Sequence, residues 1–113
     1  MLARNIVSLI VPLTIILLAI PLIFEKVPRN GFYGLRTAFT MSSDAVWYYA
    51  NRISGIALLL AGIFWLVLSH ILPNLMEDRR YAYKLVSLLG AASIVVGCSI
   101  SYWLAHTRFK NRS

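Results

Sequence analysis

The sequence predicts an all-α fold, an integral membrane protein with three transmembrane helices and a structured polar loop between the first two. Of the 113 residues, 59% are hydrophobic and 13% are charged, which is more apolar surface than a small soluble core can bury. Three runs without charged residues lie at about 6–24, 53–72 and 85–105. As a helix, each run can cross a hydrocarbon core of about 30 Å, and none has the alternating pattern of a barrel strand. We therefore expect residues 1–113 to form one three-span membrane domain.

The first run, 6–24, has a secretory signal peptide as its alternative interpretation. No pair of small residues suited to cleavage follows it, since the run ends in Pro21, Leu22, Ile23 and Phe24 before Glu25. We interpret it as a retained helix. Pro12 and Pro21 lie inside it and are expected to kink or loosen it locally, as ordinary membrane-helix prolines or as a gating hinge.

The segment 25–52 is polar and divides into two parts. Up to Met41 it is rich in turn-forming residues, and Gly34 can adopt backbone angles that other residues avoid. A helix is predicted to begin at Ser42 or Ser43, because either serine can cap it and Asp44 complements its dipole. No helix breaker precedes the second run, so this helix should continue into it.

The second and third runs are expected to form an antiparallel hairpin joined by the loop 73–84. Pro73 and Asn74 should end one helix, and Glu77 and Asp78 should start the next. Helices in lipid approach closely where side chains are small, so a stripe of small residues on the third run should contact another helix. Packing on the second run of the same chain is the first interpretation, and a homodimer is the alternative. The stripe consists of Gly90, Ser93, Gly97 and Ser101.

The Lys and Arg residues predict the orientation. The N-terminus and second loop carry four of them, Arg4, Arg79, Arg80 and Lys84, whereas the first loop and C-terminal tail carry seven. The positive-inside rule then places loop 25–52 and the C-terminus in the cytoplasm and the N-terminus outside. We interpret the net charge of +7 as attraction to a lipid bilayer with anionic headgroups rather than to nucleic acid.

The helix expected after Ser43 carries two polar stripes, one with Trp47 and Asn51 and the other with Asp44 and Arg52. We expect Arg36, placed by the Gly34 turn, to meet either Asp44 or an external anion, because a guanidinium binds carboxylate or phosphate through two donors. The alternative role of Arg36 is structural, in which it fastens the loop to helix ends through carbonyls and Asp44.

The order of residues in this loop resembles the signature of the SdpI family of small bacterial membrane proteins. Together with Asp44, the residues that carry the resemblance are the candidate binding residues: Pro28, Asn30, Gly34, Arg36, Thr37, Thr40, Asp44, Trp47, Asn51 and Arg52. The resemblance implies a location in the bacterial cytoplasmic (inner) membrane. It also implies toxin immunity or a signal-receptor role through residues 28–52, with a peptide toxin or a cytoplasmic regulator as partner. The family's immunity protein is larger, with a further membrane half before this module.

The sequence offers no catalytic constellation. It has no recognisable Ser-His-Asp order, no paired carboxylates within one loop, no His and Cys at metal-ligand spacing and no phosphate-binding glycine loop. We therefore predict no catalytic residues, no metal and no cofactor, and favour a binding protein. Two alternatives stay open: a small membrane enzyme acting on a lipid or peptide headgroup through Arg36, Asp44, Asn51 and Arg52, and an accessory subunit of a larger membrane complex.

Overall fold

The computed structural model describes residues 2–31 and 33–109, with side chains in the first helix described from Ser8 onward. Within these residues the chain forms three α-helices and no strand: α1 (Leu2–Ile23), α2 (Asp44–Leu75) and α3 (Arg79–Phe109). The predicted all-α fold is thus confirmed for the described part of the chain.

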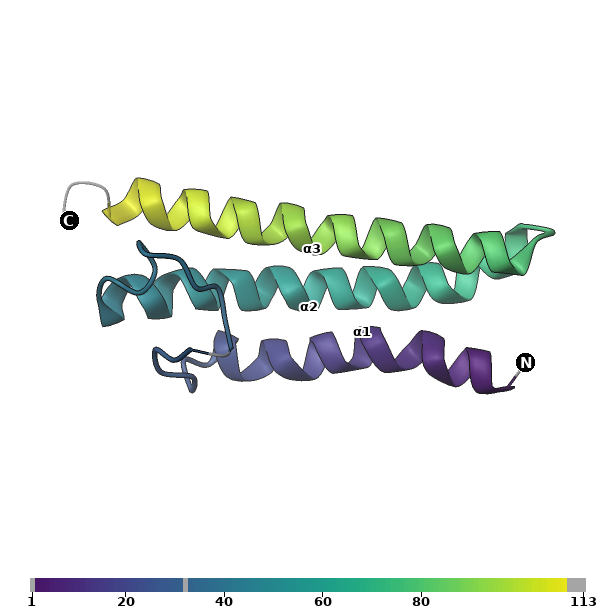
Figure 1. Cartoon of the computed structure of the whole chain (residues 1–113), viewed down its shortest axis with the longest axis horizontal. Helices are drawn as coiled ribbons and strands as arrows, with labels where there is room; N and C mark the ends of the chain where they lie inside the picture. Colours follow the sequence, from purple (N-terminus) through teal and green to yellow (C-terminus); the bar gives the residue numbers. More distant parts are fainter. Residues whose placement is uncertain (1, 32, 110–113) are drawn as a thin grey trace.

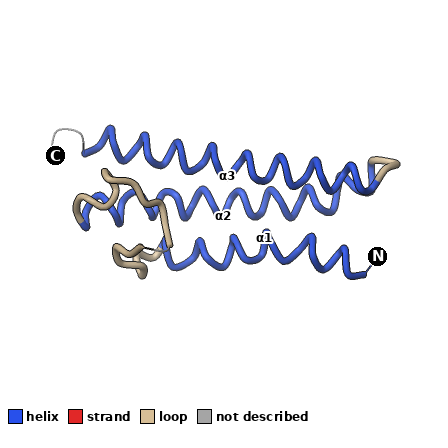
Figure 2. Tube along the Cα trace, viewed as in Figure 1, coloured by secondary structure: helices blue, strands red, loops and turns tan. Residues whose placement is uncertain are grey.

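The three helices run side by side, with α2 between α1 and α3 and packed against both (Figure 1). The bundle measures 53 × 22 × 19 Å. The long polar loop lies at one end, together with the C-terminal end of α3, and the short α2–α3 connection lies at the other end with the start of α1 (Figure 2). The bundle therefore has a loop end and a connection end.

The first helix ends in a Schellman motif. The backbone N–H of Lys26 donates to the carbonyl of Pro21 (2.9 Å), and that of Glu25 donates to the carbonyl of Leu22 (3.3 Å). Glu25 has φ 58°, the left-handed conformation that this motif requires. The chain therefore turns sharply out of α1 into the loop.

The second helix begins where the sequence predicts. Ser43 is its N-cap, with the side-chain oxygen accepting from Val46 N–H (3.2 Å), and Asp44 lies in the first turn. The helix then continues without interruption to Leu75, so the polar segment and the apolar run form one element.

The second loop is shorter than predicted, because the helices cover most of 73–84. Pro73 lies inside α2, and Asp78 caps α3 by accepting from the N–H groups of Arg80 (3.0 Å) and Tyr81 (3.3 Å). Only residues 76–78 connect the helices. Apolar runs mark the part of a helix that suits hydrocarbon, whereas helical hydrogen bonds continue through charged residues beyond it.

Small residues set the approach of the helices. A β-carbon on Gly55 would lie 3.0 Å from the Ala19 carbonyl of α1, and one on Gly97 would lie 2.8 Å from the Ala57 β-carbon of α2. Within the third-helix stripe, Gly90 and Ser101 are buried as well. The stripe thus packs against α2 of the same chain, while a homodimer through these residues stays a prediction.

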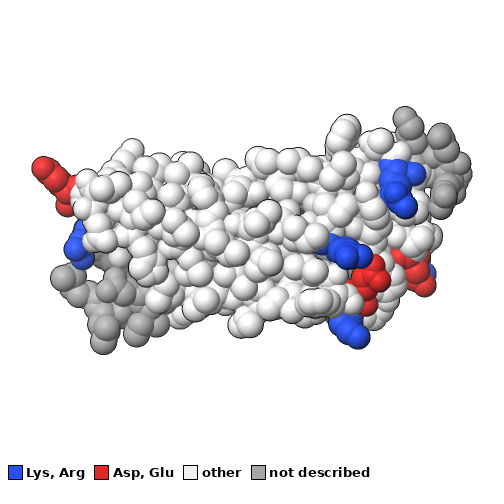
Figure 3. Space-filling model, turned by 180° about the vertical axis from the view of Figure 1, so that it is seen from behind, with Lys and Arg blue, Asp and Glu red and all other residues white. Residues whose placement is uncertain are grey.

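The outer surface is apolar along the middle of the bundle. Two helices, α2 and α3, are long and apolar enough to cross a membrane, and α1 contains a shorter apolar stretch, Ser8–Ile23. On the face seen in Figure 3, Lys, Arg, Asp and Glu gather toward the two ends and leave an uncharged band between them. Large apolar side chains such as Leu60 and Leu88 point outward, 61% and 67% exposed.

Candidate functional site

The side chain of Asn51 holds the loop against α2. It is 2% exposed, and its Oδ1 accepts from the backbone N–H of Leu35 at 2.5 Å. Its Nδ2 donates to the Trp47 carbonyl at 3.0 Å and lies 3.4 Å from the Leu35 carbonyl. One buried amide therefore binds both polar groups of the Leu35 backbone, in place of a secondary-structure partner.

The close contact between this part of the loop and α2 requires the glycine at position 34. Gly34 has φ 110°, which side-chain-bearing residues rarely adopt. A β-carbon there would lie 2.7 Å from Asn51 Oδ1 and 3.1 Å from the Trp47 ring. Gly34 thus fits for two independent reasons, backbone angle and space.

Thr37 and Thr40 close the next turn by bonding to each other. The hydroxyl of Thr40, which is fully buried, accepts from the Thr37 N–H (2.7 Å) and donates to the Leu35 carbonyl (2.8 Å). The Thr37 hydroxyl in turn accepts from the Thr40 N–H (3.0 Å). Both threonine hydroxyls are therefore engaged in holding the loop.

Trp47 and Tyr33 tie the first half of the loop to the helices. The fully buried indole of Trp47 donates to the Val27 carbonyl at 2.7 Å, and the Tyr33 hydroxyl donates to the Leu18 carbonyl of α1. Burial raises the pKa of the Tyr33 phenol above its ordinary value. Asn30 shapes the turn between them, accepting from Tyr33 N–H (2.7 Å) and donating to the Pro28 carbonyl (2.8 Å).

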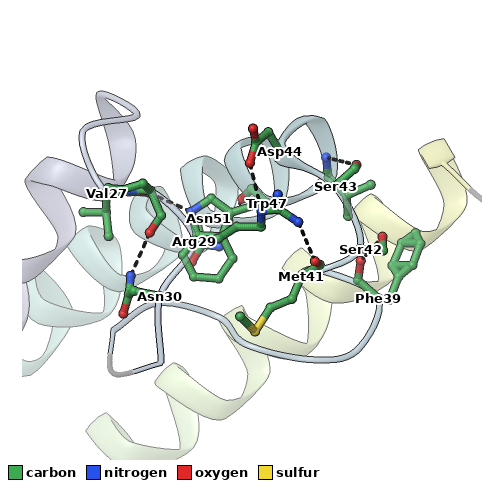
Figure 4. A network of polar contacts seen from close by, with 12 residues as sticks. Val27, Arg29, Asn30, Phe39, Met41, Ser42, Ser43, Asp44, Trp47 and Asn51 are labelled. Carbon is green, nitrogen blue, oxygen red and sulfur yellow. Dashed lines mark hydrogen bonds and ion pairs between the residues drawn. The ribbon is translucent and has the colours of Figure 1, made fainter.

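Arg29, not Arg36, is the partner of Asp44. Its Nε lies 2.8 Å from Asp44 Oδ1, and its Nη1 donates to the Met41 carbonyl at 2.9 Å, so that it bridges the loop and the start of α2 (Figure 4). This corrects the expectation that Arg36 meets Asp44 and also its structural alternative. Asn51 binds the backbone of Leu35, the residue before Arg36, whereas the Arg36 side chain is exposed.

Two of the ten candidate residues have charged side chains that are not paired within the described part of the fold. Arg36 and Arg52 are exposed and make no hydrogen bond or ion pair with any residue that the structure describes. Arg52 lines a groove of about 430 Å³ at the loop end, together with Glu25, Tyr48, Tyr49 and Arg108. The Arg108 guanidinium lies 5.1 Å from the centre of the Tyr49 ring. The other eight residues belong to the framework that holds the loop.

The loop also contacts α3 through Phe39. Its ring centre lies 4.9 Å from that of His106 and 6.1 Å from that of Tyr102. The loop therefore crosses α2 and reaches both outer helices, since Tyr33 binds α1. Sequence reasoning missed Arg29, Tyr33 and Phe39 as framework residues, because an arginine or aromatic residue in a polar loop has many possible partners.

The buried polar side chains in the described part of the chain find their partners within the fold. No group of three His, Cys, Asp or Glu side chains gathers among the described residues. Within the same part of the chain, every buried side-chain nitrogen and oxygen has a hydrogen-bond partner. What the loop presents to a second molecule is therefore its exposed charge, Arg36 above all.

Comparison with known proteins agrees with the pattern in this loop. The model of the SdpI/YfhL protein family matches residues 26–106, which include nearly all of the loop, the whole of α2 and most of α3. Comparisons with curated proteins and with solved structures gave no match. The family match covers more than half of the chain and contains all ten candidate residues. The chain therefore belongs to the SdpI/YfhL protein family.

Proposed function

We propose that this chain is a three-span protein of the bacterial cytoplasmic membrane, with the loop end in the cytoplasm and the N-terminus outside. The apolar lengths of α2 and α3 support it. For α1 the support comes from its outward side chains, with Leu17 67% and Ile10 53% exposed. The excess of Lys and Arg at the loop end supports the orientation.

Within this frame, residues 28–52 form a binding surface for an anionic group on a partner, in a toxin-immunity or signal-receptor role. The observation that carries the proposal is the exposed Arg36 without a described partner, on a loop whose buried polar side-chain groups are all hydrogen-bonded. A guanidinium on a pre-ordered loop binds carboxylate or phosphate without a further ordering cost to the backbone.

The compartment favours a cytoplasmic regulator with an acidic segment as the partner. A peptide toxin that enters the membrane is the second candidate for the same surface. The enzyme alternative receives less support, because Asn51 is buried with its amide bonded to backbone groups and Asp44 is paired with Arg29. Asn51 is therefore inaccessible to a substrate, and the exposed carboxylate of Asp44 already has a cationic partner.

The test replaces Arg36 and measures activity and folding separately. Arg36→Lys keeps the charge and removes the planar pair of donors, while Arg36→Gln removes the charge. Both variants should insert and melt like the parent chain, because Arg36 holds nothing in the framework. Both should lose activity, measured as growth of a sensitive bacterium under a secreted peptide toxin and as recruitment of the regulator to membranes.

Lys26→Gln is the matched control, since Lys26 is an exposed cation near the start of the same loop. It should keep activity. If Arg36→Gln kept full activity at full folded yield, the proposed surface would be wrong. If Arg36→Lys lost activity only in proportion to its folded protein, Arg36 would be a framework residue instead.

A further inference from the structure

The connection end of the bundle, far from loop 28–52, contains two adjoining grooves of about 430 and 350 Å³. They are lined by α1, α2 and α3 together, and they share Ser8, Ser69 and Tyr83. None of the ten candidate binding residues lies in this region. Charged residues line one part of these grooves, and apolar residues line another.

The charged part is basic. Arg80 and Lys84 line the larger groove, and Arg79 and His70 line the smaller one. Arg80 and Lys84 are one turn apart, so they lie on the same side of α3. No Asp or Glu is among the described residues that line either groove. The nearby Asp78 carboxylate accepts from backbone N–H groups at the start of α3.

The apolar part extends from the charged end toward the middle of the bundle. Val11 of α1, Trp65 of α2 and Val86 of α3 form its walls. Trp65 can lie directly against α3 because the facing residue is Gly90, where a β-carbon would overlap the indole ring. Val11 is 43% exposed, so this part of the groove wall is accessible from outside the bundle.

We propose that the larger groove binds an anionic phospholipid, with its phosphate at Arg80 and Lys84 and an acyl chain along Val11 and Trp65. Charge complementarity selects the headgroup, since each Lys or Arg near an anionic membrane surface strengthens the attraction to it about fivefold. The apolar wall selects a ligand with a hydrocarbon tail, because a free phosphate would leave that wall uncovered. The site needs only the membrane-spanning arrangement of the proposed function and not the role of Arg36.

Quenching of Trp65 fluorescence by brominated lipid tests the site in the full chain. The background variant is Trp103→Phe, because Trp103 is 63% exposed and would respond to bulk lipid, whereas Trp47 is fully buried. The chain is reconstituted in phosphatidylcholine vesicles with an equal minor fraction of brominated phosphatidylglycerol or brominated phosphatidylcholine. Brominated phosphatidylglycerol should quench Trp65 at a several-fold lower mole fraction.

Lys84→Gln should reduce the preference for brominated phosphatidylglycerol about fivefold. Lys26→Gln, which removes a charge at the other end of the bundle, should leave it unchanged. Should Lys84→Gln insert poorly by circular dichroism, Arg80→Gln provides the same test. Equal quenching by the two lipids, or equal loss of preference in Lys84→Gln and Lys26→Gln, would overturn the proposal. If millimolar inorganic phosphate abolished the stronger quenching by brominated phosphatidylglycerol, the groove would be a simple anion site and the lipid assignment would be overturned.

Discussion

At the scale of single residues, exposure divides the signature into two groups with different roles. Asn51, Trp47 and Thr40 are buried and bonded to backbone groups, so they act on the shape of the loop. Arg36 and Arg52 are exposed and contribute nothing to that shape in the described residues. Substitutions in the first group should therefore act through folding, and substitutions in the second through binding.

Replacing Asn51 tests the first group. Asn51→Ala leaves the Leu35 N–H, close to α2, without its partner, and an unsatisfied buried donor costs about 1–3 kcal/mol. We expect a lower melting temperature in detergent. Asn74→Ala is the control, because Asn74 lies on the same helix and is exposed, donating to the His70 carbonyl. Equal melting of the two variants would show that the amide of Asn51 does not hold the loop.

The grouping of these residues could be predicted from the sequence, but part of their pairing could not. Trp47 and Asn51 are four residues apart, so a helix places them on one face, and a glycine between turn-forming residues indicates a tight turn. The predicted partner of Asp44 was wrong. Arg29 and Arg36 are both in the loop, and the spacing of residues along an irregular chain does not determine where their side chains point. Every residue has a backbone carbonyl, so the sequence does not indicate that those of Val27 and Leu35 are the ones that accept these hydrogen bonds.

At the scale of elements, the contact between α2 and α3 depends on small side chains. Gly97 faces Ala57, and Gly90 faces the ring of Trp65, so one helix supplies the space that the other fills. The small-residue spacing predicted this close contact from the sequence. The helix ends were predicted less well, because hydropathy measures where a helix suits hydrocarbon and both α2 and α3 continue into charged sequence.

Overpacking this contact tests it. A β-carbon on Gly97 would already lie 2.8 Å from that of Ala57, so Gly97→Leu must push α3 away from α2, at a cost of about 1–3 kcal/mol. We expect lower folded yield in mild detergent. Ala92→Leu adds a similar volume at an exposed position of α3 and should fold normally. Normal folding of Gly97→Leu with a changed oligomeric mass would instead favour the homodimer prediction.

At the scale of the whole molecule, the bundle has an apolar middle and charged ends, and the two ends differ in their chemistry. The loop end carries the bonded polar framework with Arg36, while the connection end carries basic grooves between the helices. The proposed orientation places these two surfaces in different compartments. It therefore determines which partners can reach each of them.

Reporter fusions test the orientation. Seven Lys and Arg lie on the side of the first loop and C-terminal tail, against four on the other side, so a reporter after Ser113 should be active in the cytoplasm. One fused before Met1 should report the outside. Adding two lysines to the connection at 76–78 should weaken the preference for a cytoplasmic C-terminus, because it reduces the difference in positive charge between the two sides of the membrane. A C-terminus found outside would place Arg36 beyond the reach of any cytoplasmic regulator, leaving an external peptide as the partner that the loop could meet.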